Sequence, residues 1–298
     1  MITKTVASGP LRPARLAIRK SLIRRHIHAV ATGGSQVLTL ELNDREIDMA
    51  ALLVTEAAQL ELDSAPFKRL ATAVRRAGLA DAVIDGLSSR DPIVKARCIR
   101  VAGAMRMEPL VTWIGPLMWA GEPVIRSSAA RALGRIGGAR SADALLAAIQ
   151  RLGPRPMFII ALARAAPDLY LETVLRSPQQ KSAHPAAAMA AGIRRRRTAT
   201  VALMDQLSGG SRRMRVVCSR ALGWIGAPVG AQALSTALMD RDWRVRMSAA
   251  KALGSISSYE PGALLHMCLM DRNPRVQRGA RDAIRRLSHD LSTVKSEA

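Results

Sequence analysis

Two stretches of the chain, separated by a short interval, have nearly the same sequence. Residues 240–256 read DRDWRVRMSAAKALGSI, and residues 271–287 read DRNPRVQRGARDAIRRL. Gly254 of the first copy lies midway between Gly223 and Arg285, so the interval occurs more than once. A fixed period of about 31 residues indicates a repeat array, which constrains the fold more than any local motif does.

Further copies complete the array between residues 66 and 290. Gly103 and Gly134 are separated by the same interval, and weaker copies at Ala163 and Gly192 fill the gap to Gly223 at nearly the same spacing. No unit of this size can bury its apolar face alone, so neighbouring units must stack. The sequence therefore predicts an all-α fold, an α-solenoid (superhelix) of about seven two-helix repeats.

Each copy predicts a first helix with recurring alanines, a short connection, and a second apolar helix. Apolar residues make up 49% of the chain but aromatic residues only 3%, which favours close helix packing over a sheet. A glycine after the first helix is expected to end it in the left-handed conformation. Asp240, Asp242 and Asp271 are expected to cap the helices that follow.

The segments VRMSAAKALGSI and VIRSSAARALGRIG resemble HEAT-type repeats. They are similar to the short variety, of roughly 30 residues, found in phycobilisome-lyase-like proteins of bacteria. The resemblance covers residues 66–290 and implies a two-helix solenoid. It implies little about activity, because the same repeat carries lyases, hydroxylases, DNA-repair enzymes and scaffolds.

Three segments lie outside the array. Residues 1–35 form a basic amphipathic segment and linker, which is either a helix for an anionic membrane or acidic partner, or a cap over the first repeat. Residues 36–65 form an acidic lead-in helix, and residues 291–298 a disordered tail. Four apolar side chains are expected on one side of the first helix: Leu16, Ile23, Ile27 and Val30.

The net charge of +22 and the pI near 11.5 favour an acidic partner, which could be nucleic acid, anionic lipid or protein. The alternative is that the basic surface has no acidic partner. It would then reflect only a proteome rich in arginine and would keep molecules of this protein apart by charge repulsion. Residues 67–290 hold 36 basic and 15 acidic side chains, so the array carries most of the excess.

The basic residues of the array recur at fixed distances before each anchor glycine. Eight residues before it stand Lys95, Arg126, Arg215 and Arg246, which we expect to pair with an Asp of the inter-repeat turn. Three residues before it stand Arg100, Arg131, Arg220 and Lys251. The solvent-facing candidates for an anionic partner are the series ten residues before it and an exposed basic loop: Arg213, Arg244, Arg275, and Arg194, Arg195, Arg196 and Arg197.

The second helices carry almost no charge. In HEAT-type arrays the second helix usually lines the concave face, so the resemblance implies a small, neutral, partly apolar groove. A nucleic-acid clamp would place arginines there, and their absence favours a protein groove. The candidate groove residues are Gln232, Ser235, His266 and Met267.

The sequence has few groups of residues that could act together in catalysis. The five histidines have no adjacent Glu, which excludes the His-Glu iron sites of hydroxylases with this repeat. Cys98 and Cys218 stand where other repeats have alanine and are expected to pack in the core, and an odd cysteine count without a secretory signal favours a reducing cytosol. The longest uncharged run, at 109–121, is too short to cross a membrane. We expect no catalytic residue, metal or cofactor, and we infer no small-molecule substrate.

The sequence thus predicts a non-enzymatic, cytoplasmic scaffold or adaptor that binds a protein. The whole chain also resembles bacterial HEAT-repeat proteins encoded beside membrane glycosyltransferases, which implies a place at the cytoplasmic membrane surface. The alternatives are a nucleic-acid-binding solenoid that uses the basic edge, and a DNA glycosylase or lyase on the same scaffold.

Overall fold

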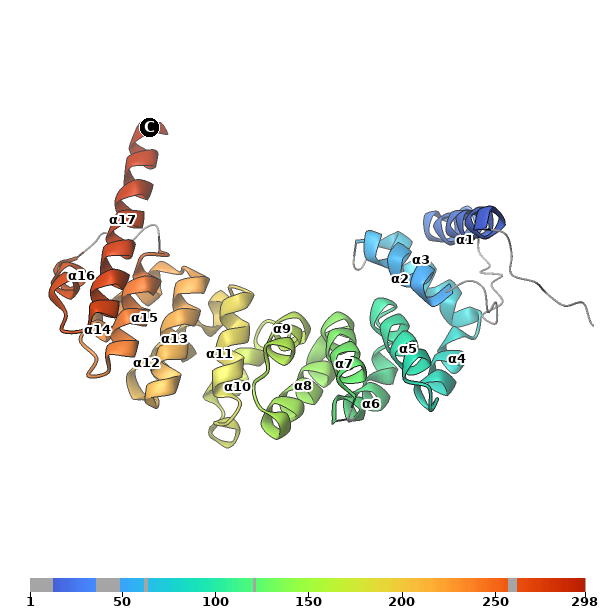
Figure 1. Ribbon diagram of the computed structural model, residues 1–298, viewed down its shortest axis with the longest axis horizontal. Helices are drawn as coiled ribbons and strands as arrows, with labels where there is room; N and C mark the ends of the chain where they lie inside the picture. The colour runs from blue at the N-terminus through green and yellow to red at the C-terminus, as the bar shows by residue number, and fades with distance from the viewer. Residues whose placement is uncertain (1–12, 36–48, 62–63, 120–121, 257–261, 298) are drawn as a thin grey trace, which may run out of the picture. The chain divides into compact units, whose positions relative to one another are not determined.

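The computed structural model shows an all-α solenoid, as the repeats predict (Figure 1). It describes residues 13–35, 49–61, 64–119, 122–256 and 262–297, and every regular element in these ranges is helical. Residues 36–48, part of the expected acidic lead-in, lie outside the described residues. The chain divides into two compact units, residues 1–136 and 137–298.

Unit 1 begins with helices that precede the regular repeats and ends with two first helices, α5 and α7, which pack on each other. Helix α2 packs on α5, and α1 packs on α3. The bounds are α1 (Pro13–Thr32), α2 (Met49–Gln59), α3 (Ala65–Arg76), α4 (Leu79–Leu87), α5 (Pro92–Ala104), η1 (Glu108–Leu110), α6 (Val111–Ile114), η2 (Gly115–Trp119) and α7 (Pro123–Ile136).

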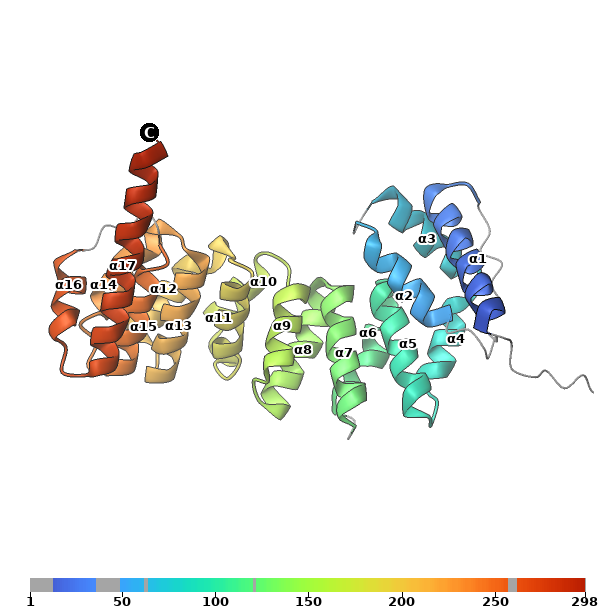
Figure 2. The same cartoon turned by 45° about the horizontal axis from the view of Figure 1, so that its top comes forward.

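Unit 2 alternates second and first helices, and its first helices α9, α11, α13, α15 and α17 pack side by side (Figure 2). The bounds are α8 (Gly138–Leu152), α9 (Pro156–Ala165), α10 (Tyr170–Arg176), η3 (Pro178–Gln180), α11 (His184–Ile193), η4 (Arg197–Ala199), α12 (Thr200–Gly209), α13 (Arg212–Ile225), η5 (Pro228–Gly230), α14 (Ala231–Ala237), α15 (Trp243–Leu253), α16 (Ala263–Met267), η6 (Cys268–Met270) and α17 (Pro274–Glu297).

The anchor glycines set the spacing of the first helices. A Cβ atom on Gly254 would lie 2.6 Å from the Cα of Ala283, and one on Gly103 would lie 2.7 Å from the Cα of Ala132. Real Cβ atoms do not approach backbone so closely, so any side chain here would push the next helix away. The same contact joins two further pairs: Gly192 to Ala221, and Gly223 to Ala252. We call these contacts the Gly–Ala seam.

After α5, α11 and α13, the backbone turns left-handed three residues beyond the anchor. Gly226, with φ of 68°, closes α13 as predicted. Arg106 and Arg195 occupy the same place in other repeats with φ of 48° and 51°. The Nε of Arg106 donates a 3.2 Å hydrogen bond to the carbonyl of Arg135, a contact that glycine could not make. The prediction of glycine stops therefore holds for Gly226 and misses two arginines.

The predicted aspartate caps are correct at one position of three. Asp242 caps α15 by accepting the N–H of Arg244 at 2.8 Å. Asp240 and Asp271 instead accept the N–H of the residue two positions later, each at 2.8 Å, and Asn273 caps α17. The prediction is wrong for these two because they precede the cap and their carboxylates receive arginines from the preceding first helix.

Helix α17 departs from the repeat pattern at two positions. At the anchor position, where the seam of other first helices has glycine, it carries the exposed Arg285. At the place of the pairing arginine it carries Gln277, which donates a 2.7 Å hydrogen bond to the carbonyl of Asp271. The helix continues to Glu297, which differs from the expected disordered tail at 291–298, because no glycine or proline follows Gly279.

Candidate interaction site

A groove of about 430 Å³ lies on the exposed side of the first helices, mainly between α11 and α13. Its walls carry the aliphatic side chains of Pro185, Met189, Val216 and Val217, and we call it the apolar groove. The complete lining is Pro154, Ile159, Pro185, Met189, Arg212, Arg213, Val216, Val217, Arg220 and Arg244. The apolar groups thus lie beside arginines that come from α13 and α15.

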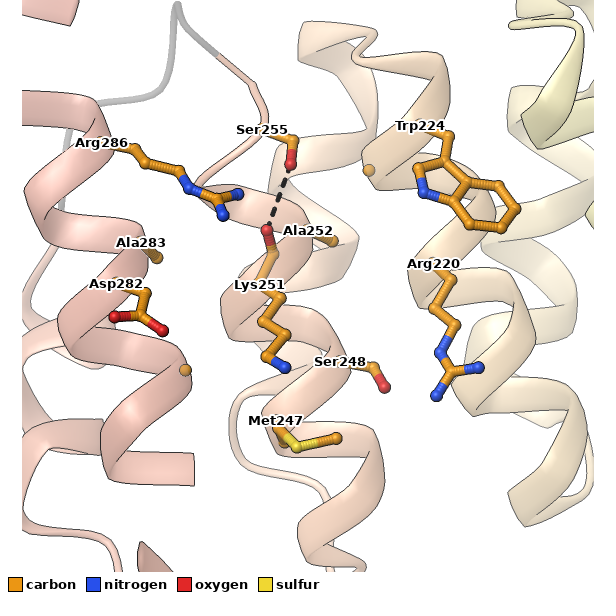
Figure 3. Close-up of a pocket in the computed structure, with 12 residues that line it drawn as sticks. Arg220, Trp224, Met247, Ser248, Lys251, Ala252, Ser255, Asp282, Ala283 and Arg286 are labelled. Carbon is orange, nitrogen blue, oxygen red and sulfur yellow. Dashed lines mark hydrogen bonds between the residues drawn. The ribbon is translucent and has the colours of Figure 1, made fainter. Parts of the chain in front are cut away.

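A second groove, of about 340 Å³, crosses α13, α15 and α17 (Figure 3). It receives one cation from each helix, Arg220, Lys251 and Arg286, and one carboxylate, Asp282, and we call it the basic groove. None of these four side chains forms an ion pair within the described part of the chain. The remaining lining is Gly223, Trp224, Met247, Ser248, Ala252, Ser255, Gly279 and Ala283.

Ser248 lines the basic groove, and its hydroxyl oxygen is buried without a hydrogen-bond partner among the described residues. Its side chain is buried, at 3% exposure, on the side of α15 that faces Arg220 (Figure 3). Ser255 in the same groove satisfies its hydroxyl by donating to the carbonyl of Lys251 at 3.3 Å. A buried hydroxyl left unpaired costs about 1–3 kcal/mol, so Ser248 can gain from a polar ligand.

The two grooves share Arg220 and form one surface over α11–α17, which we call the first-helix surface. Arg220 and Trp224 are one turn apart on the exposed side of α13, away from the buried Leu222. The sequence showed Arg220 and Lys251 in one series but gave that series no role. The spacing of exposed residues one turn apart could have indicated this surface.

The series eight residues before the anchor is structural in unit 2. Arg215 donates to both carboxylate oxygens of Asp240 at 2.7 and 3.0 Å, and Arg246 to those of Asp271 at 2.7 and 2.9 Å. Arg246 also donates to the carbonyl of Asp240 at 2.8 Å. These fork geometries confirm the predicted pairing with the inter-repeat turn.

The paired arginines lower the pKa of their partners. The guanidinium of Arg246 beside Asp271 holds the pKa of that carboxyl below its ordinary value. Partial burial alone would raise the pKa of Asp240, but hydrogen bonds from Arg215 and from the backbone N–H of Asp242 outweigh it, and the pKa is lowered. These groups stabilise the fold and are not available to a ligand.

The same series differs in unit 1. Arg126 donates a 3.1 Å hydrogen bond to the carbonyl of Met118. Lys95 forms no ion pair among the described residues, so the predicted pairing with an Asp is wrong there. Arg215 and Arg246 each pair with an aspartate 25 residues further along the chain, whereas the residue 25 positions after Lys95 is Ala120, which has no carboxylate.

The series ten residues before the anchor is exposed, as predicted. The guanidinium carbons of Arg244 and Arg275 lie 4.7 and 5.3 Å from the ring centre of Trp243. Arg213 and Arg244 both line the apolar groove. The structure therefore places Arg244 both beside the Trp243 ring and in the lining of the apolar groove. The sequence gave no reason to connect Trp243 with a groove.

The basic loop 194–197 does not present four free arginines. Arg195 has the left-handed conformation of a helix stop, and Arg196 turns back to form an ion pair with Asp168 and a 3.4 Å hydrogen bond to the carbonyl of Ala166. The prediction of an exposed loop is therefore wrong for Arg196. Three exposed cations remain: Arg194, Arg195 and Arg197.

The candidates on the second helices lie on α14 and α16. Gln232, His266 and Met267 are exposed or partly exposed, and Ser235 is half-buried. A groove of about 660 Å³ does run between α12 and α14, which we call the second-helix groove. Its lining contains none of the four: Met204, Leu207, Ser208, Arg215, Ala233, Thr236, Ala237, Met239, Asp240 and Arg241.

Helix α1 packs within unit 1. Ile27 and Val30 are buried, and the Nε of Arg69 on α3 donates to the carbonyl of Ala31 at 2.9 Å. These contacts favour the interpretation of α1 as a cap over the helices that follow it. Ile23 is half-buried, and nothing is described for the side chain of Leu16.

The titratable groups of the described residues do not form a reactive cluster. Burial raises the pKa of the Cys218 thiol to about 12, and burial also raises the pKa of Cys98 and Cys268. Burial, with the hydrogen bond to Asp143, raises the pKa of Tyr170. Cys218 is fully buried, as predicted for a core position, whereas Cys98 is only half-buried.

The described residues contain no group of three or more His, Cys, Asp and Glu side chains that could hold a metal ion. Among the same residues, no helix is both long and apolar enough to cross a membrane.

A family model described as HEAT repeats matches residues 80–154 and 200–285, which together make up more than half of the chain. The chain therefore belongs to the HEAT-repeat family. The match is to HEAT repeats in general, and the narrower resemblance to phycobilisome-lyase-like proteins stays a prediction. No curated protein matches the chain.

Several solved structures resemble the chain at low identity. Human deoxyhypusine hydroxylase in complex with glycerol is 17% identical with a TM-score of 0.37, over 94% of this chain and 100% of that one. Kap121p bound to Nup53p is 13% identical with a TM-score of 0.43, over 92% of this chain but only 38% of Kap121p. An engineered protein is 16% identical with a TM-score of 0.37, over 94% and 88%. Such values carry no argument about function.

Proposed function

We propose that this HEAT-repeat chain is a non-enzymatic scaffold that binds a protein partner on the first-helix surface of unit 2. The observation that carries the proposal is the apolar groove, whose aliphatic walls are open to solvent beside the arginines of α13 and α15. Large apolar side chains on the same first helices are also exposed, with Ile193 at 42% and Trp224 at 42%. Exposed apolar patches with polar rims are typical of protein interaction sites.

Two further observations support a scaffold over an enzyme. The thiols have raised pKa values and are therefore protonated at neutral pH, so they are poor nucleophiles. The buried His184 is hydrogen-bonded through Nε2 to the carbonyl of Ser177 at 2.9 Å, with no carboxylate in that contact. Three free cysteines also favour a reducing compartment such as the cytoplasm.

A random 16-residue peptide-display selection on the full chain tests this proposal. We expect selected peptides to bind wild type and to lose binding to the double variant Met189→Ser and Val216→Ser. A Met239→Ser variant, which changes an exposed methionine of the second-helix groove, is the matched control and should bind normally. The proposal would be contradicted if no peptide survived the selection, or if the selected peptides bound the double variant as tightly as wild type.

A nucleic-acid-binding solenoid is the second candidate. It is favoured by the arginines at the starts of α15 and α17 in unit 2. Arg244 and Arg275 are exposed there and both stack on Trp243. Titration of a labelled 20-base-pair DNA duplex against salt tests it. Micromolar binding with a steep log–log slope, reduced by Arg244→Gln and Arg275→Gln, would favour this candidate.

A further inference from the structure

We propose that the partner bound on the first-helix surface is an acidic protein segment that uses both grooves. Its apolar side chain fills the apolar groove, and its Asp or Glu carboxylates enter the basic groove beside Arg220, Lys251 and Arg286. This inference rests on the proposed function and adds the chemistry of the partner. It commits to a protein segment as the occupant.

Charge complementarity is the first argument. The basic groove has three cations against one carboxylate, Asp282, and none of the four is paired within the described residues. This differs from Arg215 and Arg246, whose forks are occupied by aspartates of the inter-repeat turns. Cations that a fold does not use internally remain free for carboxylates of a partner.

The unpaired hydroxyl of Ser248 is the second and independent argument. It is buried in the basic groove, on the side of α15 that faces Arg220 (Figure 3). Once rotation about the Cα–Cβ bond of Ser248 turns its hydroxyl toward the groove, a carboxylate oxygen there would accept the hydroxyl proton while it also receives a guanidinium N–H. The groove therefore offers donors of two kinds, and Ser248 has no acceptor among the described residues that would compete with the ligand.

The neighbouring apolar groove decides between a protein segment and a nucleic-acid strand. The two grooves share Arg220, so one ligand can occupy both. Pro185, Met189 and Val216 provide aliphatic walls, which suit a leucine, methionine or phenylalanine side chain. Single-stranded nucleic acids are bound instead through successive aromatic rings on which bases stack, whereas the lining of the apolar groove has no aromatic ring and that of the basic groove has a single one, Trp224.

The display selection also tests the charge of the partner. We expect the selected pool to be enriched in Asp and Glu together with large apolar residues. The triple variant Arg220→Gln, Lys251→Gln and Arg286→Gln should bind the selected peptides about tenfold more weakly, since three exposed ion pairs each contribute a few-fold. The matched control removes three exposed cations outside both grooves: Arg194→Gln, Arg195→Gln and Arg197→Gln.

Ser248→Ala gives a readout that a merely structural role would not produce. Without peptide, the variant should unfold at the same or a higher temperature, because it removes a buried unpaired hydroxyl. With peptide, it should bind a few-fold more weakly than wild type. Lower stability without peptide, or unchanged binding, would overturn the role given to Ser248.

Failure of this inference can be told from failure of the proposed function. If peptides depend on Met189 and Val216 but are neutral or basic, and the triple variant binds them normally, the scaffold stands and the acidic partner is wrong. If the Arg194, Arg195 and Arg197 variant loses binding instead, the contact lies at that loop and the inference is overturned. If the DNA duplex competes with the peptides at physiological salt, the surface is a general polyanion site, which also overturns it.

Discussion

The same position of the first helices carries different chemistry in the two units. In unit 2, Arg215 and Arg246 fork onto aspartates of the turn that follows. In unit 1, Arg126 donates to the carbonyl of Met118, and Lys95 forms no ion pair within the described residues. Both units nevertheless have the Gly–Ala seam. The seam is therefore the common determinant of the stacking, and these ion pairs with turn aspartates reinforce it in unit 2.

The largest effect should follow from filling the seam, and it should be alike in both units. Gly254→Val and Gly103→Val each place a side chain within 2.7 Å of the next helix backbone, which we expect to cost about 3 kcal/mol of unfolding free energy. Urea denaturation measures it. Gly209→Ala, where no atom lies within 4 Å of the added Cβ, is the control and should be neutral or slightly stabilising. A mild effect at Gly103 alone would show that unit 1 does not depend on its seam.

The ion-pair series should separate the units. Arg246→Ala leaves the carboxylate of Asp271 unpaired and should cost about 2 kcal/mol, since hydrogen bonds to charged groups contribute about 1.5–3 kcal/mol. Lys95→Ala, at the same position in unit 1, should cost less than about 0.5 kcal/mol, because Lys95 forms no ion pair among the described residues. Equal costs in thermal or urea unfolding would contradict the contrast between the units.

Acid should weaken unit 2 through the same pairs. The pKa values of Asp240 and Asp271 are lowered in the folded state, so their stabilisation is present above the ordinary value of 3.8 and is lost as pH falls below it toward the folded pKa. The difference in unfolding free energy between wild type and Asp271→Asn should therefore shrink from pH 6 to pH 3. A difference that stays constant over this range would rule out the titration of Asp271 as its cause.

Helix caps should give smaller effects than the seam or the Arg246 pair, again alike in both units. Ser64 accepts the N–H of Phe67 at the start of α3, and Ser211 accepts that of Met214 at the start of α13, each at 3.3 Å. Replacing either serine by alanine should cost about 1 kcal/mol in urea denaturation. A loss at Ser211 several times that at Ser64 would show that this cap also supports the packing of unit 2.

The repeat period was readable from sequence because the seam admits only the smallest residues. Gly103, Gly223 and Gly254 must recur where the next helix approaches, and the regular spacing of the copies follows from this. Alternating first and second helices then follow from the apolar pattern. Left-handed backbone at residues other than glycine was harder to predict, because it depends on local conformation and not on the size of the side chain. For that reason Arg195 was not expected at a left-handed helix stop.

The candidate site was only partly predictable. Arg220 and Lys251 stood out as a series, but whether they were paired depended on the carboxylates that the fold brings near them. The neutral second helices drew attention to Gln232 and Met267, yet residues one turn apart on the first helices line the apolar and basic grooves. Nothing in the sequence marks Ser248 as unpaired, since that depends on its neighbours in space.

Methionine methyl NMR with a selected acidic peptide distinguishes binding on the first helices from binding on the second helices. Met189 and Met247 line the apolar and basic grooves, whereas Met204 and Met239 line the second-helix groove. We expect the Met189 and Met247 methyl signals to shift, with those of Met204 and Met239 unchanged. Shifts at Met204 and Met239, with Met189 and Met247 unmoved, would place the partner on the second helices and contradict the proposed function.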